Sequence, residues 1–167
     1  MINKLFIITL SLLLFGSSFS QKVIEKYIPE QYEETRIDTI LDSTTNLRVL
    51  IIRKTLMNKS VSFTYTLENN QTSIHRYRDY SSEITVFKSD SVLFKSTFNK
   101  NDFEQIYDEE FLKEAITYNT WIQGYDKKNK TIKISHVIGV PETDWNYHFT
   151  IFIDENGGYN SELDEIE

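Results

Sequence analysis

Apolar and polar residues alternate along much of the chain, most clearly in the segment 61–68. In an extended chain, its apolar residues would point to one side and its polar residues to the other. The apolar set is Val61, Phe63, Tyr65 and Leu67, and the polar set is Ser62, Thr64, Thr66 and Glu68. A period of two is typical of a β-strand with one face in water. Similar patterns predict strands near 33–41, 47–57, 73–80, 83–88, 92–98, 119–126, 131–138 and 146–153.

The predicted strands are separated by short polar turns, such as Asn69-Asn70, Ser89-Asp90-Ser91 and Lys128-Asn129. Turns this short between strands favour antiparallel pairing. No Gly/Ser-rich or Pro-rich linker divides the chain after its N-terminal region. We therefore expect one β-rich domain over residues 32–156, a lead-in over 21–31 that is loosely held, and a frayed acidic tail over 157–167.

One segment changes from a period of two to a helical period. Asp102 and Gln105 have the spacing of a capping box, which predicts a helix near 102–116. An apolar stripe follows at helical spacing, formed by Phe103, Ile106, Tyr107, Phe111, Leu112 and Ala115. The acidic residues between them favour a helix that packs on a sheet with its charged side in water, and the alternative is an acidic docking surface. The predicted fold class is α+β: mainly antiparallel sheet of about 7–9 strands with one amphipathic helix.

The first twenty residues have the pattern of a secretory signal. Lys4 gives a positive start, residues 5–15 are almost entirely apolar, and Ser18-Phe19-Ser20 places small residues at the cleavage positions. The apolar run is too short to cross a bilayer. We expect cleavage after Ser20 and a periplasmic or extracellular location. Because residue 21 is Gln, a bacterial lipoprotein anchor is not expected, nor is any other stable membrane anchor.

Charge and cysteine content narrow the function classes. The formal net charge of −7 disfavours nucleic acid and anionic lipid as partners. Cysteine is absent, so hydrophobic burial rather than disulfides must hold an exported fold together. A small secreted domain without disulfides favours a bacterial source.

His136 and His148 lie on two predicted neighbouring strands, which suggests a metal site shared by the two imidazoles. The expected pairing register of these strands tests this hypothesis. Burying apolar faces together places His136 beside Phe149 and leaves His148 on the opposite side, so the two imidazoles share no metal. A tight turn at Lys128-Asn129 would place Trp121 beside His136. His136 is then either a core residue or the polar group of a pocket floored by Trp121.

Trp145 and Tyr147 follow the loop 141–144 and could form an exposed stacking platform for a sugar, although Trp145 could equally close the core. The candidate ligand-binding residues are therefore Trp121, His136, Trp145 and Tyr147. Residues 154–165 match a calcium loop poorly, because Gly158 and Tyr159 stand where an oxygen ligand and a turn glycine are required. We predict no metal site and no cofactor.

Catalytic motifs are scarce in this sequence. It has no cysteine nucleophile, no Gly-x-Ser-x-Gly elbow and no glycine-rich phosphate loop. Its many carboxylates leave open a glycoside-hydrolase pair, whose spacing the sequence does not reveal. The leading hypothesis is a non-catalytic binding or accessory module for an unknown protein or glycan ligand; the alternative is a carboxylate-dependent hydrolase acting on a glycan or cell-surface substrate.

Three features of the sequence are considered together. The signal is expected to be cut before Gln21, and the chain lacks Cys and is rich in Ile, Asn, Tyr and Phe. It also contains two characteristic stretches, ITVFKSDSVLFKSTFNKNDF (84–103) and PETDWNYHFTIFIDENG (141–157). In these features the chain resembles small exported β-rich proteins of unknown function from Bacteroidetes. The resemblance implies a β-rich fold and an exported location. It implies no catalytic or binding residue.

Overall fold

The computed structural model describes residues 23–68, 71–103, 105–106 and 108–164. The predicted signal segment 1–20 lies outside these ranges, as does Tyr107 of the predicted helical stripe. Neither helix in the described part of the chain is long and apolar enough to cross a membrane.

The described residues form nine strands in two sheets, and only one strand pair, β1 with β4, is parallel. The predicted class, mainly antiparallel sheet with little helix, is confirmed. The strands are β1 (Val23–Ile28), β2 (Glu34–Asp42), β3 (Leu47–Thr66), β4 (Thr72–Lys88), β5 (Ser91–Phe98), β6 (Ile116–Asp126), β7 (Thr131–Gly139), β8 (Asn146–Ile153) and β9 (Tyr159–Leu163).

The first sheet is built on one long hairpin of β3 and β4. The strands predicted at 47–57 and 61–68 belong to β3, and those predicted at 73–80 and 83–88 belong to β4. β2 pairs with the first half of β3, and β5 pairs with the second half of β4. β1 runs parallel to the first half of β4, on the same side of it as β5.

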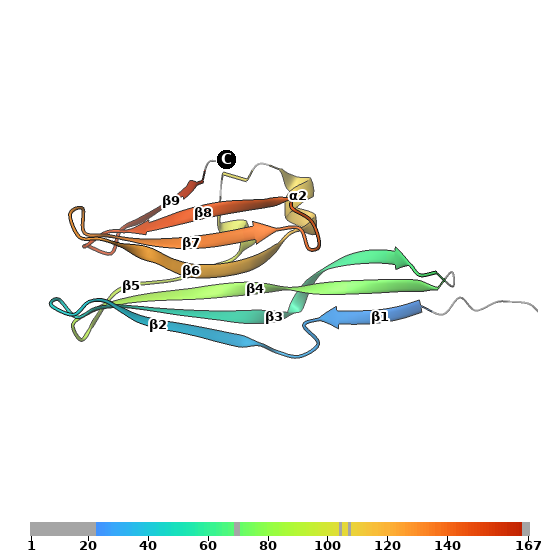
Figure 1. Ribbon diagram of the computed structural model, residues 1–167, viewed down its shortest axis with the longest axis horizontal. Helices are drawn as coiled ribbons and strands as arrows, with labels where there is room; N and C mark the ends of the chain where they lie inside the picture. Colours follow the sequence, from blue (N-terminus) through green and yellow to red (C-terminus); the bar gives the residue numbers. More distant parts are fainter. Residues whose placement is uncertain (1–22, 69–70, 104, 107, 165–167) are drawn as a thin grey trace, which may run out of the picture.

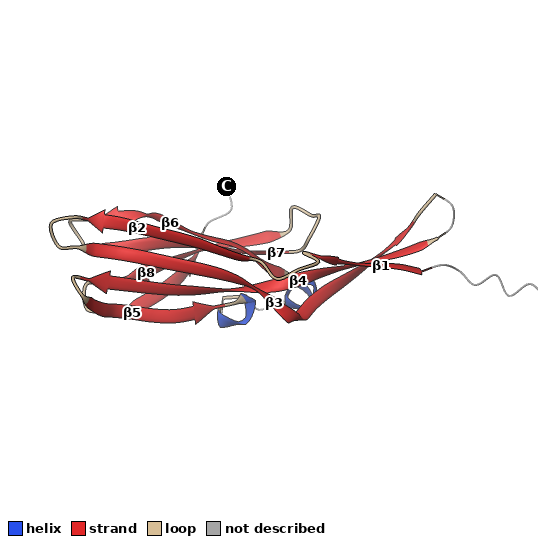
Figure 2. Cartoon of the chain, turned by 90° about the horizontal axis from the view of Figure 1, so that it is seen from below, coloured by secondary structure: helices blue, strands red, loops and turns tan. Residues whose placement is uncertain are grey.

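The second sheet has the order β6-β7-β8-β9 and covers only part of the first sheet (Figures 1 and 2). We call the covered part, together with the second sheet, the sandwich. The remainder projects beyond the second sheet as a single layer, and we call it the wing. The wing consists of β1, residues 60–66 of β3 and residues 72–78 of β4.

The core lies between the two sheets of the sandwich and follows the alternation of the strands. Inward-facing residues from both sheets are almost fully buried, and the segment between β5 and β6 adds four more apolar residues, Phe103, Ile106, Phe111 and Ala115. The principal members are Val49, Ile51, Ile84, Val86, Phe94, Phe98, Phe103, Ile106, Phe111, Ile132, Ile134, Ile138, Phe149, Ile151 and Ile153. A smaller cluster lies where the wing meets the second sheet, and we call it the wing cluster: Val61 and Tyr77 of the wing pack with Ile116 of β6, and Ile28 and Phe63 lie against them.

A bulge in β3 marks the joint between the sandwich and the wing. The pairing passes from Leu56 opposite Asp79 to Ser60 opposite Arg78, which leaves three residues of β3 unpaired. The buried Arg78 guanidinium bonds one carbonyl inside the bulge and one outside it: Nη1 donates to Met57, and Nε donates to Pro29 after β1 at 3.1 Å. Arg78 therefore connects β4 to the bulge and to the segment after β1.

The helix predicted over 102–116 is wrong in extent. The structure has a 3-10 turn, η1 (Lys100–Asp102), and a six-residue helix, α2 (Glu109–Glu114). Asp102 ends the 3-10 turn and accepts from the backbone of Asn99 rather than starting a helix. Asp108 is the actual N-cap: its Oδ1 accepts from the amides of Glu110 and Phe111, each at 3.0 Å. The chain crosses here from one sheet to the other, so its apolar residues enter the core from irregular backbone as well as from α2.

Two edge strands were absent from the predicted set. β1 lies in the segment expected to be a loosely held lead-in, and β9 lies in the segment expected to be a frayed tail. Both expectations are wrong for these residues, since β1 pairs with β4 and β9 pairs with β8. Both strands are short and mostly exposed, so backbone hydrogen bonds place them without a clear apolar pattern.

Candidate functional site

Four turns gather at the end of the sandwich farthest from the wing (Figure 1). They connect β2 to β3, β4 to β5, β6 to β7 and β8 to β9. Each contains one residue with positive φ: Asn46 (48°), Ser89 (54°), Lys130 (53°) and Gly157 (84°). This conformation reverses the chain within a few residues and brings all four turns to one surface.

Three of these turns begin with an aspartate that organises the turn's own backbone. Asp42 Oδ1 accepts from the Thr44 amide at 2.9 Å. Asp126 Oδ1 accepts from two turn amides, at 2.9 and 3.1 Å. Asp154 Oδ1 accepts from the amides of Asn156 and Gly158, at 2.7 and 2.9 Å. These carboxylates have the local bonding of Asx turns, which gives them a structural role.

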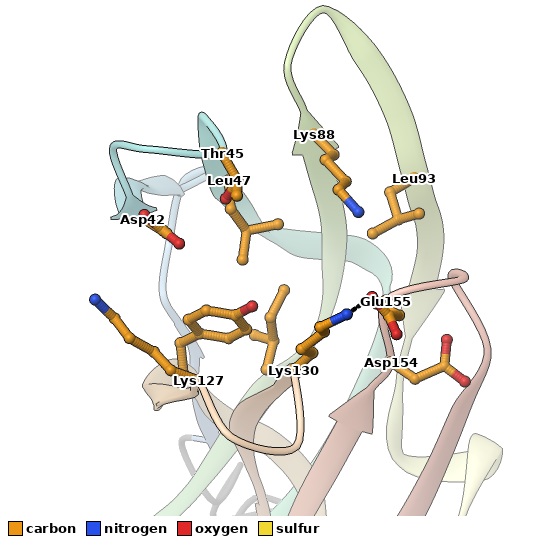
Figure 3. Close-up of a pocket in the computed structure, with 11 residues that line it drawn as sticks. Asp42, Thr45, Leu47, Lys88, Leu93, Lys127, Lys130, Asp154 and Glu155 are labelled. Atoms are coloured by element: carbon orange, nitrogen blue, oxygen red, sulfur yellow. Dashed lines mark hydrogen bonds and ion pairs between the residues drawn. The ribbon is translucent and has the colours of Figure 1, made fainter.

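A cavity of about 250 Å³ opens between the four turns (Figure 3). Its apolar lining is the end of the core that faces the four turns and is formed by Leu47, Leu93, Tyr125 and Ile132. Its rim is charged and carries Lys88, Lys127, Lys130, Asp42, Asp154 and Glu155. Drug-sized sites occupy roughly 300–1,000 Å³, so this cavity suits a smaller group with an apolar side.

The rim charges are not equally available to a ligand. Lys130 Nζ bonds Glu155 Oε2 at 2.7 Å, so these two charges largely satisfy each other. Lys88 takes part in no ion pair within the described residues, and Figure 3 shows its side chain reaching into the cavity toward Leu93. Lys127 also takes part in no ion pair among these residues, but it helps to lower the pKa of Asp42 and so lies near a rim carboxylate. We therefore consider the ammonium of Lys88 as the rim charge that meets an anionic group.

The rim carboxylate Asp42 does not suit the role of a glycosidase acid. Such an acid retains its proton near neutral pH. The Thr44 amide lowers the pKa of Asp42, which favours the anion. The same holds for Asp126 in the β6–β7 turn, outside the cavity lining, whose pKa is lowered by turn contacts led by the Asn129 amide. Both groups suit turn bonding rather than general-acid catalysis.

Comparison with protein families identifies the domain. Residues 43–160 match the family described as Domain of unknown function (DUF4738). The chain belongs to this family. A search of curated proteins gives no match. The DUF4738 match begins in the β2–β3 turn and ends in β9, so it includes most of the cavity lining.

His136 of the DUF4738 domain is fully buried in the core. Its ring stacks on Phe103 with centroids 4.8 Å apart, and its Nδ1 lies 2.8 Å from Thr120 Oγ1. Thr120 Oγ1 in turn lies 2.7 Å from Ser82 Oγ. Burial, with a smaller contribution from Arg53, lowers the pKa of His136 to about 3, so the ring is neutral near pH 7. Its Nε2 has no hydrogen-bond partner within the described residues.

The predicted register is confirmed on one side of β7 and wrong on the other. His136 pairs with Phe149, and His148 lies on the opposite face opposite Val137, as predicted. On β6, however, Thr120 rather than Trp121 pairs with His136. An irregularity between Ile122 and Gly124 shifts the register by one residue, which exchanges the two faces of the strand.

The four sequence candidates do not converge on one place in the DUF4738 domain. Trp145 and Tyr147 both contact Phe111 of α2, with centroid distances of 5.2 and 4.6 Å. Trp145 is 39% exposed, whereas His136 lies inside the core and Trp121 is half-buried on β6. A ligand-binding role for these residues stays a prediction. Among the described residues, His, Cys, Asp and Glu side chains form no group of three suited to a metal.

The cavity was missed by sequence reasoning because its lining comes from four turns far apart in the chain. The only local signal was the recurrence of Asp at the ends of predicted strands. Lys88 stands at the end of a predicted strand and carries no motif of its own. It shares a cavity with Tyr125 of β6 only once both sheets have formed.

Proposed function

We propose that this protein is a secreted or periplasmic binding module that takes an acidic sugar residue of a glycan in the four-turn cavity. The observation that carries the proposal is that Lys88 lines the cavity together with apolar residues and the aromatic ring of Tyr125, and that its side chain points into the cavity toward Leu93 (Figure 3). A sugar ring offers an apolar face to such a lining, while a uronate carboxylate offers an anion to Lys88. The carboxylates on the rim can accept hydrogen bonds from sugar hydroxyls.

The pattern of residues 1–20 supports the proposed location, because an exported module meets extracellular and cell-wall glycans. The chemistry proposed at the cavity is binding alone. The aspartates that begin the turns are engaged by backbone amides, so they support the shape of the rim.

A thermal-shift screen tests the proposal with glucuronate and galacturonate, their short oligomers, glucose and inorganic phosphate. At a ligand concentration of 100 times Kd, binding stabilises a protein by about 2.7 kcal/mol. For a chain of this size, this corresponds to a rise in Tm of roughly 5–10 °C. We expect this rise with uronates or their oligomers and little change with glucose.

Lys88→Met is the decisive variant because it keeps most of the side-chain length and removes the charge. It should abolish the shift caused by uronates, whereas Lys113→Met on α2 serves as a matched control and should retain it. A shift that survives in Lys88→Met, or no shift with any uronate, contradicts the proposal. An equal shift with phosphate would indicate a general anion site rather than a sugar site.

A further inference from the structure

Four polar side chains converge where the wing meets the second sheet. Tyr65 comes from β3, His75 and Tyr77 come from β4, and Glu142 comes from the loop between β7 and β8. Tyr65 Oη donates to Glu142 Oε2 at 2.8 Å, and Tyr77 Oη donates to Glu142 Oε1. Tyr77 Oη also lies 3.4 Å from His75 Nδ1. Two phenols, a carboxylate and an imidazole therefore share one small volume.

The backbone at Glu142 is unusual. Its φ is 63°, in the left-handed region that a residue with a side chain adopts at a cost. Such conformations gather at functional sites, where surrounding contacts hold them in place. Here the two tyrosine hydroxyls hold the glutamate, so the loop presents its carboxylate directly to the wing.

The spacing of these donors suits coordination of one small cation. Metal bonds of about 2.0–2.1 Å place neighbouring ligand atoms roughly 2.9 Å apart in an octahedron and roughly 3.4 Å apart in a tetrahedron. In one octahedral site, the separation of 2.8 Å between Tyr65 and Glu142 already fits, and the separation of 3.4 Å between Tyr77 and His75 would close by about 0.5 Å. A cation could thus replace the shared protons without large movement of the ligands.

Access to the cluster is graded. Tyr77 is 7% exposed, Tyr65 and His75 are half-buried, and Glu142 is exposed. The packed side orients the phenols, since the Tyr77 ring contacts Phe63 at 5.8 Å and the Tyr65 ring contacts His75 at 4.6 Å. The exposed side allows an ion to enter from solvent.

We infer that Tyr65, His75, Tyr77 and Glu142 form a binding site for a trivalent, oxygen-preferring cation, which we assign as ferric iron. Two phenolates and one carboxylate supply three negative charges, which balance the charge of the ion. Anionic oxygen ligands favour hard cations, imidazole is a common iron ligand, and iron accepts tyrosine oxygen as a ligand in proteins.

The proton balance selects for a strongly acidic cation. Both phenols carry protons in the metal-free cluster, because each donates a hydrogen bond to a carboxylate oxygen of Glu142. Binding breaks two O–H bonds, forms two iron–oxygen bonds and releases two protons to solvent, with no change of oxidation state. A weakly polarising cation such as Ca²⁺ or Mg²⁺ does not displace protons held this firmly.

The test is a titration of the purified protein with ferric citrate, followed by visible absorption. Tyrosinate bound to ferric iron produces a charge-transfer band that neither citrate nor the metal-free protein has. We expect this band to saturate at one iron per chain. Zn²⁺ and Mn²⁺, added as competitors at equal concentration, should leave it unchanged.

Tyr65→Phe and Tyr77→Phe keep the aromatic packing and remove one ligand each. Each should weaken iron binding by about tenfold or more, given that even outer-shell changes at metal sites reach this scale. The double variant should show no band, and Tyr159→Phe, on exposed β9, is the matched control that should bind normally. Circular dichroism establishes that every variant is folded.

A band that persists in the double variant overturns the assignment of these ligands. Displacement of iron by equimolar Zn²⁺ overturns the choice of a trivalent cation. Absence of a band in the unaltered protein, with a lower Tm in the Tyr→Phe variants, shows that the cluster is a structural tie between wing and sandwich and overturns the proposal.

Discussion

The sandwich and the wing are built on the same two strands but are stabilised by different interactions. Val49 and Val61 both face inward from β3, yet Val49 is fully buried between two sheets and Val61 is 8% exposed in the single-layer wing. The sandwich core includes large apolar residues from both sheets, whereas the wing cluster has three principal members. Hydrophobic burial therefore contributes much more to the stability of the sandwich than to the stability of the wing.

Polar and aromatic contacts are correspondingly more important in the wing. The Arg78 guanidinium lies 4.3 Å from the centre of the Tyr27 ring in addition to its two backbone hydrogen bonds. Glu142 ties the wing to the second sheet through both of its carboxylate oxygens. The difference shows how the β3–β4 hairpin can continue beyond the second sheet. Where the second sheet no longer buries its apolar side chains, hydrogen bonds and contacts between charged groups and aromatic rings stabilise it instead.

The largest expected effect comes from breaking the joint at Arg78. Arg78→Ala removes a buried guanidinium and leaves the carbonyls of Pro29 and Met57 without this donor. We expect a loss of about 3 kcal/mol in the free energy of unfolding, measured by urea denaturation. Amide exchange should accelerate more at Val61 than at Ile134. A matched change at the half-buried Arg76, Arg76→Ala, should be much milder. Equal effects of the two variants would contradict a special role for the joint.

The second prediction compares the two regions directly by making the same change, Val to Ala, at two positions of β3. Val49→Ala opens a cavity between two sheets and should cost about 2–3 kcal/mol, whereas Val61→Ala should cost about 1 kcal/mol because the thin wing can relax around it. Chemical denaturation of both variants checks the difference. If Val61→Ala is as costly as Val49→Ala, the wing is packed as firmly as the sandwich and the comparison fails.

The third prediction uses pH to separate the regions, because His136 lies in the sandwich core. Its pKa is about 3 in the folded protein, against an ordinary value of 6.5. The unfolded chain therefore binds more protons between these values, and stability is lost as pH falls below 6.5. This one group should remove about 2 kcal/mol between pH 7 and pH 5. His136→Phe should flatten that part of the stability profile, and an unchanged slope would contradict a buried neutral histidine.

Local patterns predicted the parts of this fold in which one face is buried and the turns are short. The β7–β8 register followed from matching Ile134, His136 and Ile138 to the apolar residues of β8. The same logic failed on β6, because the irregularity at Ile122 exchanges the faces and apolar alternation alone does not reveal where a bulge lies. The helix failed for a related reason: Asp102 and Asp108 both resemble N-caps, and only the crossing between sheets selects Asp108.

The candidate sites depend on contacts that are distant in the sequence. His75 and Tyr77 stand in a segment, 73–80, for which the sequence predicted a strand and no site. Their partner Glu142 is 65 residues beyond Tyr77, and no local motif connects them. The four-turn cavity is similar, because its lining residues come together only after the two sheets pack.

The parallel strand β1 has a consequence for the order in which the chain can assemble. Val23 pairs with Thr72, and Ile28 pairs with Tyr77. Because its partner residues lie in β4, β1 stays without a partner strand until the chain through Tyr77 is free to fold. During that interval its backbone edge is unpaired, and Glu25 and Lys26 place charges on the strand, a feature that discourages pairing with other chains. The strand nearest the beginning of the chain is thus among the later ones to join its sheet.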